Sequence, residues 1–451
     1  MDVMRFDLHG LALTTGSDEA AAAFDRTIMA YLKYRTDTPV HLAGALAADP
    51  DFALAHCLQG YLAMTSFKQA NACVAEEAAR KARALSASAT ARESAHVEAL
   101  EAWIAGDLDR TLGVWEQVLT EYPVDVLAFR LAHFLNFWLG RPRAMRASAE
   151  QLRSRWGSEL PGYGTLLSCL CFAREECGDY GAAEPAGWQA LDIDCADFWG
   201  THALAHVMEM MGRQSDGIAL LESSERHWPG GNNLLHHLAW HRALFHYERR
   251  EFDVVLDLYD NRFRDLGSPL TSAVPDLYID VQNAASMLFR LERQGVDVGD
   301  RWGELADKAE QRIGDCLSAF TLPHWMMALA ATGRTAAADR MLAGMRAFGA
   351  GSGTVAEVVR EAALPASEAV LAHRQGDHGR AVALMRTALR RMHALGGSHA
   401  QQDVLLQLYV DAAAKSSHHD DLETALALAA SGRRPAGERV GYVEAALLLA
   451  R

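Results

Sequence analysis

The chain has 451 residues, half of them apolar and 8% aromatic, and its 43 Lys and Arg against 58 Asp and Glu give a formal charge of −15. This acidic balance argues against a nucleic-acid-binding surface and against attachment to an anionic membrane, because both require clustered basic residues. At this length we expect either two or three domains or one extended repeat array.

The first residues and the cysteines indicate the compartment. Met1–Ala12 lacks the basic start and apolar run of a secretory signal, and the apolar stretches are far shorter than the roughly 18–20 residues that cross a bilayer. The seven cysteines include no C-x-x-C pair, which suits reduced thiols better than a disulfide framework. We therefore expect a cytoplasmic protein with no nucleic-acid or membrane partner.

Short turns recur between segments rich in the helix formers Ala, Leu, Arg and Glu. The turn residues are Gly106, Gly140, Gly178 and Gly212, with related turns at Arg250, Gly333 and Gly376. The steps between the first four are 34, 38 and 34 residues, which is typical of helical hairpins that stack on their neighbours. We predict an all-α fold, a right-handed superhelix of stacked tetratricopeptide-like helical hairpins.

The domain organisation that we expect is one α-helical repeat array over residues 1–451. The alternative is a subdivision near residues 349–353, where Gly-Ala-Gly-Ser-Gly forms the one flexible stretch. The main array would then cover 1–348 and the C-terminal helical hairpins 354–451. We interpret the glycine-rich stretch as a plain loop between helices, because no strand precedes it as in a phosphate-binding loop.

Histidines and one glutamate recur on the predicted first helices of successive hairpins. Within each helix they are spaced by three or four residues, which places them on one face. Counted back from the turn residues at about 100° per residue, all of them fall within a sector of roughly 120°. These candidates for catalysis are His202, His206, Glu209, His237, His241 and His324.

Imidazole and carboxylate side chains in one place suit either proton transfer or metal binding. We predict that the six residues line a concave pocket that binds a small molecule, with acid–base or hydrolytic chemistry if the chain is an enzyme. The metal ligands, if a divalent ion is bound, would be His202, His206, Glu209 and His241. Whether a metal cofactor is present stays open, because H-x-x-x-H is common in helices and no H-E-x-x-H occurs. Hydrogen-bonded interior histidines are the equally weighted alternative.

Several neighbouring residues are candidates for the walls of this pocket. Trp199 and Trp240 would supply apolar walls. Cys169 has the same helix phase as the histidines and is either a nucleophile or, as we favour, a small buried residue. His133 and Asn136 fall outside the sector, and we interpret them as packing groups.

Two further segments carry polar residues at helical spacing. Asp276, Asp280 and Asn283 form a stripe that we interpret as a solvated face, with a ligand pocket that includes Asp280 as the alternative. Ser398 is a predicted N-cap, which places His399 in the first turn of the helix. A helix N-terminus with a histidine is a candidate anion site, although capping alone explains the pattern.

Four segments together are typical of one known family. They are Arg92-Glu93-Ser-Ala-His96 with Trp103 and Gly106-Asp107, Asp197-Phe-Trp199-Gly-Thr-His202-Ala-Leu-Ala-His206-Val-Met-Glu209, Trp240-His241, and Gly396-Gly-Ser-His399-Ala-Gln401-Gln-Asp403. On these segments the chain resembles bacterial members of the tetratricopeptide repeat protein 38 family over most of its length. The resemblance implies an α-helical repeat superhelix, and it implies no established reaction.

The alternative function is a tetratricopeptide-type scaffold for protein–protein interaction without catalysis, which would hold a partner peptide in an open groove. Peptide grooves of this kind typically use Asn, Lys and Arg clamps, whereas the His, Glu and Trp residues found here favour a small-molecule ligand. A homo-oligomer is an option in either case, because the helices expected at 423–430 and 440–449 have wide apolar faces.

Overall fold

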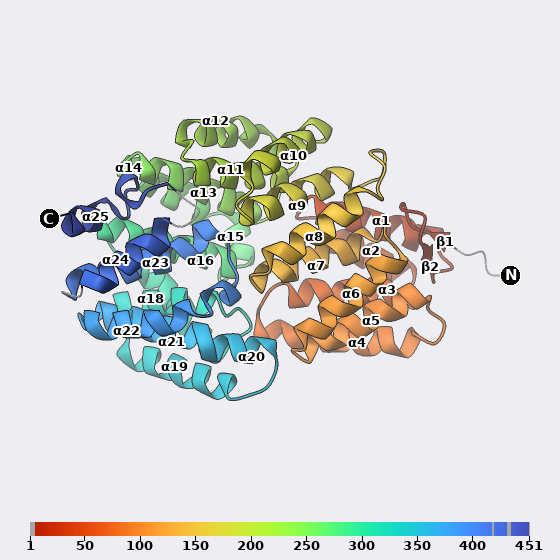
Figure 1. Ribbon diagram of the computed structural model, residues 1–451. Helices are drawn as coiled ribbons and strands as arrows, with labels where there is room; N and C mark the ends of the chain where they lie inside the picture. Colours follow the sequence, from red (N-terminus) through yellow and green to blue (C-terminus); the bar gives the residue numbers. More distant parts are fainter. Residues whose placement is uncertain (1–4, 417–418, 431–433, 451) are drawn as a thin grey trace. The chain divides into compact units, whose positions relative to one another are not determined.

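The computed structural model describes residues 5–416, 419–430 and 434–450 (Figure 1). In these ranges it is all-α apart from a two-stranded ribbon, in which β1 (Arg5–Phe6) runs antiparallel to β2 (Ala12–Leu13). The chain divides into two compact units. Unit 1 comprises Met1–Phe137, Arg141–Leu204 and Ser224–Leu234, and unit 2 comprises Trp138–Gly140, Ala205–Ser223 and Leu235–Arg451.

Unit 1 consists of antiparallel helical hairpins in chain order, drawn from red to yellow in Figure 1. Pairs that pack together include α1 with α2, α3 with α4, α5 with α6, and α9 with α10. The helices are α1 (Asp18–Leu32), α2 (Thr38–Ala48), α3 (Ala53–Met64), α4 (Ala72–Leu85), α5 (Ala91–Ile104), α6 (Leu108–Glu121), α7 (Val126–Trp138), α8 (Pro142–Arg153), α9 (Tyr163–Glu176) and α10 (Tyr180–Ile193).

Unit 2 continues the pattern, and the boundary between the units passes through α11 (Phe198–Met211), after Leu204. Two π-helical turns, Tyr259–Phe263 and Val359–Ala363, interrupt its helices. The other helices are α12 (Gln214–Ser224), α13 (Leu234–Glu248), α14 (Phe252–Leu258), α15 (Pro269–Ala273), α16 (Tyr278–Arg293), α17 (Trp302–Gln311), α18 (Thr321–Ala331), α19 (Thr335–Gly349), α20 (Thr354–Val358), α21 (Leu364–Arg374), α22 (His378–Leu389), α23 (His399–Lys415), α24 (His419–Ala430) and α25 (Val443–Leu449).

The turn residues expected from the sequence all adopt the left-handed backbone conformation, with φ between 60° at Arg250 and 79° at Gly178. At the end of α5, Gly106 N–H donates to Trp103 O and Asp107 N–H donates to Ala102 O, which satisfies two terminal carbonyls of the helix. The prediction of tetratricopeptide-like helical hairpins is confirmed, including the turn at which arginine replaces glycine.

The aspartate that follows such a turn also starts the next helix. The Asp107 carboxylate accepts the backbone N–H of Arg110 at the start of α6, and Asp179 does the same for Ala182 at the start of α10. One Gly-Asp pair therefore ends one helix and begins its partner, which explains why short loops suffice.

The glycine-rich stretch Gly349–Gly353 joins α19 to α20 within unit 2. The predicted subdivision at this point and the prediction of a single array stay predictions. Among the described residues, no helix combines the length and the apolar composition that crossing a membrane requires.

Asp197 precedes α11, the helix that carries several candidate residues. One carboxylate oxygen accepts the backbone N–H of Gly200 at 3.0 Å, which fixes the start of the helix. The side chain is buried, and this burial raises its pKa from 3.8 to about 6. The folded protein therefore holds a proton on Asp197 in a pH range where the unfolded chain has lost it.

We predict that Asp197 makes the protein lose about 3 kcal/mol of stability as the pH rises from about 4 to 7, since its folded pKa lies above its unfolded pKa. Asp197→Asn keeps the accepting oxygen and should remove this part of the pH dependence. Denaturant unfolding of both proteins at about pH 4, 5.5 and 7 measures the difference. Parallel pH profiles would contradict the assignment.

Candidate functional site

Three buried imidazoles meet inside unit 2, and we name His206, His237 and His241 the histidine centre. Each offers a ring nitrogen, and these atoms lie within 4.8 Å of one another. The ring centroids of His206 and His241 are 4.4 Å apart, and those of His237 and His241 are 4.7 Å apart. The four-residue spacing along α13 places His237 and His241 on the same face. These three histidines, which the sequence places at a common helix phase, therefore lie close together in the structure.

Hydrogen-bond acceptors hold two of these rings from outside the centre. His241 Nδ1 lies 3.0 Å from Glu209 Oε2, and His237 Nδ1 lies 3.0 Å from Asn283 Oδ1. Because both oxygens are acceptors, Nδ1 carries the proton in each neutral ring and the lone pair is on Nε2. Burial, together with the neighbouring His241, holds the pKa of His237 well below its usual range.

His202 lies one turn before His206 in α11, on the unit 1 side of the boundary. Its buried ring contacts Trp199, at 4.5 Å between centroids, and Phe172 at 5.3 Å. The i, i+4 spacing directs His202 and His206 to the same face of the helix. Within unit 1 the surroundings of His202 are therefore aromatic.

The polar stripe on α16 is buried, so the interpretation as a solvated face is wrong. Asp280 is fully buried and its Oδ2 lies 2.9 Å from His236 Nδ1. Asp276 is buried beside Arg312, with 3.1 Å between the charged atoms. Asn283 holds His237, as described above. Every residue of α16 from Asp280 to Leu291 is buried, so the helix has no solvated face in this stretch.

Three other predicted residues have surroundings of their own. His324 is buried in α18, where its Nδ1 lies 2.8 Å from Phe320 O, and burial lowers its pKa to about 4. Cys169 is buried, and the burial raises the pKa of its thiol to about 12, which argues against a thiolate nucleophile at neutral pH. His399 is exposed on the first turn of α23.

The two predicted wall tryptophans lie in different units. In unit 2, the ring of Trp240 stacks on that of His237 at 5.1 Å, with 12° between the ring planes. In unit 1, the ring of Trp199 stacks on Tyr34 at 5.7 Å. Both indoles are buried, and each stacks on a ring of its own unit.

The predicted N-cap of α23 is present. Ser398 Oγ accepts the backbone N–H of Gln401 at 3.2 Å, and Gln401 Oε1 accepts that of Ser398 at 2.9 Å. These reciprocal bonds form a capping box. Capping therefore explains the pattern without an anionic ligand at this helix end.

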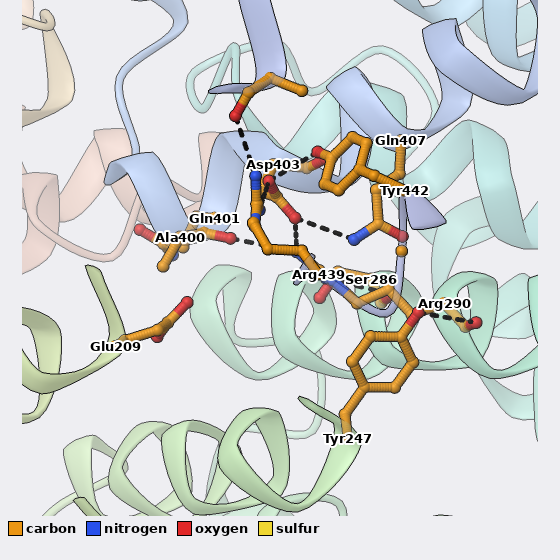
Figure 2. A network of polar contacts seen from close by, with 12 residues as sticks. Glu209, Tyr247, Ser286, Arg290, Ala400, Gln401, Asp403, Gln407, Arg439 and Tyr442 are labelled. Carbon is orange, nitrogen blue, oxygen red and sulfur yellow. Dashed lines mark hydrogen bonds and ion pairs between the residues drawn. The ribbon is translucent and has the colours of Figure 1, made fainter. Parts of the chain in front are cut away.

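A polar pocket in unit 2 is lined in part by Glu209, the residue that holds His241. The other charged residues of its lining come from α13, α16, α23 and the C-terminal segment, and Arg290, Asp403 and Arg439 among them are buried. In Figure 2, Asp403 stands at the centre of a network, and Arg439, Tyr442 and Gln407 are turned towards it. Glu209, with a side chain 16% exposed, thus connects this pocket to His241.

Sequence reasoning missed most of this network. Asp403 pairs with Arg439 and accepts a hydrogen bond from Tyr442 at 2.6 Å, and Arg290 Nη2 lies 3.7 Å from its other oxygen. Arg290 comes from α16, and Arg439 and Tyr442 come from the C-terminal segment, so no local spacing relates them to Asp403. It also missed two adjacent buried carboxylates at the end of α9, Glu175 and Glu176.

No known protein-family profile matches the chain. It is similar to the crystal structure of yeast Tom70 at 11% identity, covering 95% of this chain and 86% of that one, with a TM-score of 0.38. It is also similar to the structure of Naa15/Naa10 bound to HypK-THB at 12% identity, covering 90% of this chain and 67% of that one, with a TM-score of 0.24.

We predict that Asp403→Ala lowers the free energy of unfolding by about 3–5 kcal/mol, because it leaves Arg439 and Arg290 buried without a carboxylate. Asp260→Ala is the matched control, since Asp260 is a half-exposed partner of Arg301, and the variant should lose less than about 1 kcal/mol. Urea unfolding followed by circular dichroism measures both. Equal losses would show that the buried network adds no stability beyond that of a surface ion pair.

Proposed function

We propose that this tetratricopeptide-like helical-repeat protein binds a divalent transition-metal ion at the histidine centre, with Zn²⁺ as the reference ion. The observation that carries the proposal is the grouping of three buried imidazoles with ring nitrogens within 4.8 Å. A tetrahedral Zn²⁺ with bonds of about 2.0–2.1 Å brings its ligand nitrogens to about 3.4 Å from each other. Small side-chain rotations of His206, His237 and His241 cover that difference.

The acceptors around the centre support the same proposal. Metal-bound histidines typically donate their other ring N–H to a carboxylate or carbonyl oxygen, which orients the ring and raises its basicity. Glu209 and Asn283 lie in this relation to His241 and His237. Both contacts leave Nε2 as the nitrogen with the lone pair, and that is the atom a metal needs.

Three protein ligands leave a fourth position open at zinc, as in catalytic zinc sites. The chemistry that a bound ion supplies is polarisation of a carbonyl or phosphoryl group and activation of water. Glu209 reaches from His241 to the neighbouring polar pocket, so a small polar substrate there would lie on the side of the centre that Glu209 borders. A bound metal ion that activates water for attack on such a substrate would give the hydrolytic chemistry expected from the sequence.

A scaffold for protein–protein interaction is the second candidate, favoured by the fold itself, since stacked helical hairpins commonly present such surfaces. In unit 2, however, α23 covers α16. Arg290 donates to Ala400 O at 3.0 Å, and Gln401 donates to Gln282 Oε1 at 3.3 Å. A partner peptide would therefore need a surface other than α16. Membership of the tetratricopeptide repeat protein 38 family, a cytoplasmic location and a homo-oligomer stay predictions.

We predict that the full-length protein, purified without a polyhistidine tag and treated with a chelator, binds close to one Zn²⁺ per chain. His237→Ala and His241→Ala each remove a ligand and should weaken binding at least about 100-fold. Asn283→Leu removes only an orienting acceptor and should weaken it by about 10–100-fold. Isothermal titration calorimetry with ZnCl₂ measures all four proteins.

His393→Gln is the matched control, because His393 is exposed and distant in sequence from the histidine centre. Its zinc affinity should equal that of the wild type, and thermal unfolding should show that every variant is folded. Zinc binding that survives both His237→Ala and His241→Ala would contradict the proposal. Absence of zinc binding by the wild type would also contradict it and would favour the scaffold.

A further inference from the structure

Arg130 on α7 is a buried cation in unit 1, with 4% of its surface exposed. Its guanidinium lies over two aromatic rings, 5.0 Å from the centroid of Trp199 and 5.4 Å from that of Tyr34. One of its nitrogens donates to the Tyr34 hydroxyl. The aromatic faces stabilise the positive charge, but neither ring neutralises it.

A comparison with the other buried arginines shows how unusual this environment is. Each of the others forms an ion pair with a carboxylate, as expected for a charge taken out of water. Arg130 forms none within the described part of the chain. The paired arginines are Arg92, Arg264, Arg290, Arg312 and Arg439.

Two further polar groups near Arg130 are buried without a partner. Both ring nitrogens of His133, one turn along α7, form no hydrogen bond, and neither does the indole Nε1 of Trp199. The rings of these two residues are 6.4 Å apart, edge to face. Since an unsatisfied buried donor costs about 1–3 kcal/mol, finding two in one neighbourhood, the indole N–H of Trp199 and the single N–H of the neutral His133 ring, points to an absent acceptor.

Tyr34 borders the same neighbourhood in a conformation that few residues adopt. Its φ is 54°, in the left-handed region, and its side chain is half-buried. The segment around it is tied down, because Tyr34 O accepts the Asn232 N–H at 2.7 Å and Gly230 O accepts the Thr36 N–H at 3.1 Å. Backbone strain held by its surroundings is common at ligand-binding sites.

We infer that Arg130, His133 and Trp199 form a binding site for a small organic carboxylate. The guanidinium fork matches a carboxylate in a two-point contact, while the indole and imidazole N–H groups supply further donors. One cation balances one negative charge. A phosphate dianion would stay undercompensated, because the pKa of His133 is held well below its usual range by burial and by Arg130, so His133 adds no charge.

The surrounding rings make an organic anion more suitable than an inorganic one. Phe129 and Phe172 pack against His133, at 6.0 Å and 6.3 Å between centroids, and Trp199 and Tyr34 form the remaining aromatic faces. The carboxylate would meet Arg130, and the hydrocarbon part would contact these rings. This site lies wholly in unit 1 and does not depend on metal binding at the histidine centre.

The test uses the full-length protein and the probes acetate, butyrate and benzoate, with benzamide as the uncharged analogue and inorganic phosphate as a separate arm. We expect at least one of the three carboxylates to raise the melting temperature and to bind in isothermal titration calorimetry, and benzamide to do neither. Arg130→Gln should weaken that binding by about 10–100-fold, because a charge-assisted contact is lost. His133→Phe keeps an aromatic ring but removes the N–H donor, and it should weaken carboxylate binding about fivefold.

Arg110→Gln is the matched control, since Arg110 is an exposed arginine of unit 1 paired with Glu98. Its carboxylate affinity should equal that of the wild type. Arg130→Lys keeps the charge without the fork, and it serves if Arg130→Gln does not fold. The inference is overturned if none of the carboxylates binds the wild type, if binding persists in the Arg130 variants, or if phosphate alone binds. Zinc affinity, measured in parallel, should be unchanged in all these variants.

Discussion

The hairpins in both units depend on one backbone conformation, a left-handed residue that lies one to three residues after the end of the first helix. Glycine supplies it at most turns, and Tyr34, Phe67 and Arg250 supply it at others, so the requirement is for the conformation and not for the residue type. The residue that follows bonds back to the helix it leaves and, where it is aspartate, caps the next helix, as at Asp107. This shared turn gives the side chains of successive first helices a common reference point, the end of the helix.

The turns align successive first helices, so polar side chains at matching positions lie close together within each unit. Burying these groups costs free energy unless they have hydrogen-bond or ion-pair partners. In unit 2, Glu209 and Asn283 hold the histidine centre so that its rings present lone pairs, which suit a cation. In unit 1, Arg130 and its neighbours present N–H donors, which suit an anion. The two interiors therefore have opposite chemistry, although both are built on first helices.

What could be predicted from the sequence is what depends on short spacing: the turns, the capping box at Ser398 and the common phase of the histidines. The stripe of Asp276, Asp280 and Asn283 was misinterpreted because its partners are distant in the sequence: Arg312, His236 and His237 lie 36, 44 and 46 residues away from them, respectively. The ion pair of Asp403 with Arg439, which spans 36 residues, was missed for the same reason. Arg130 was missed because its distinguishing feature is a missing partner, and a sequence does not show absent contacts.

The most direct test of the central claim, that the histidine centre is a metal site, is a crystal structure of the zinc-loaded protein with anomalous diffraction at the zinc edge. The account predicts one strong anomalous peak at bonding distance from the Nε2 atoms of His206, His237 and His241. Asn283 should still accept a hydrogen bond from His237 Nδ1, and Glu209 should still accept one from His241 Nδ1. A peak at surface histidines alone, or an ion held through Nδ1, would contradict it.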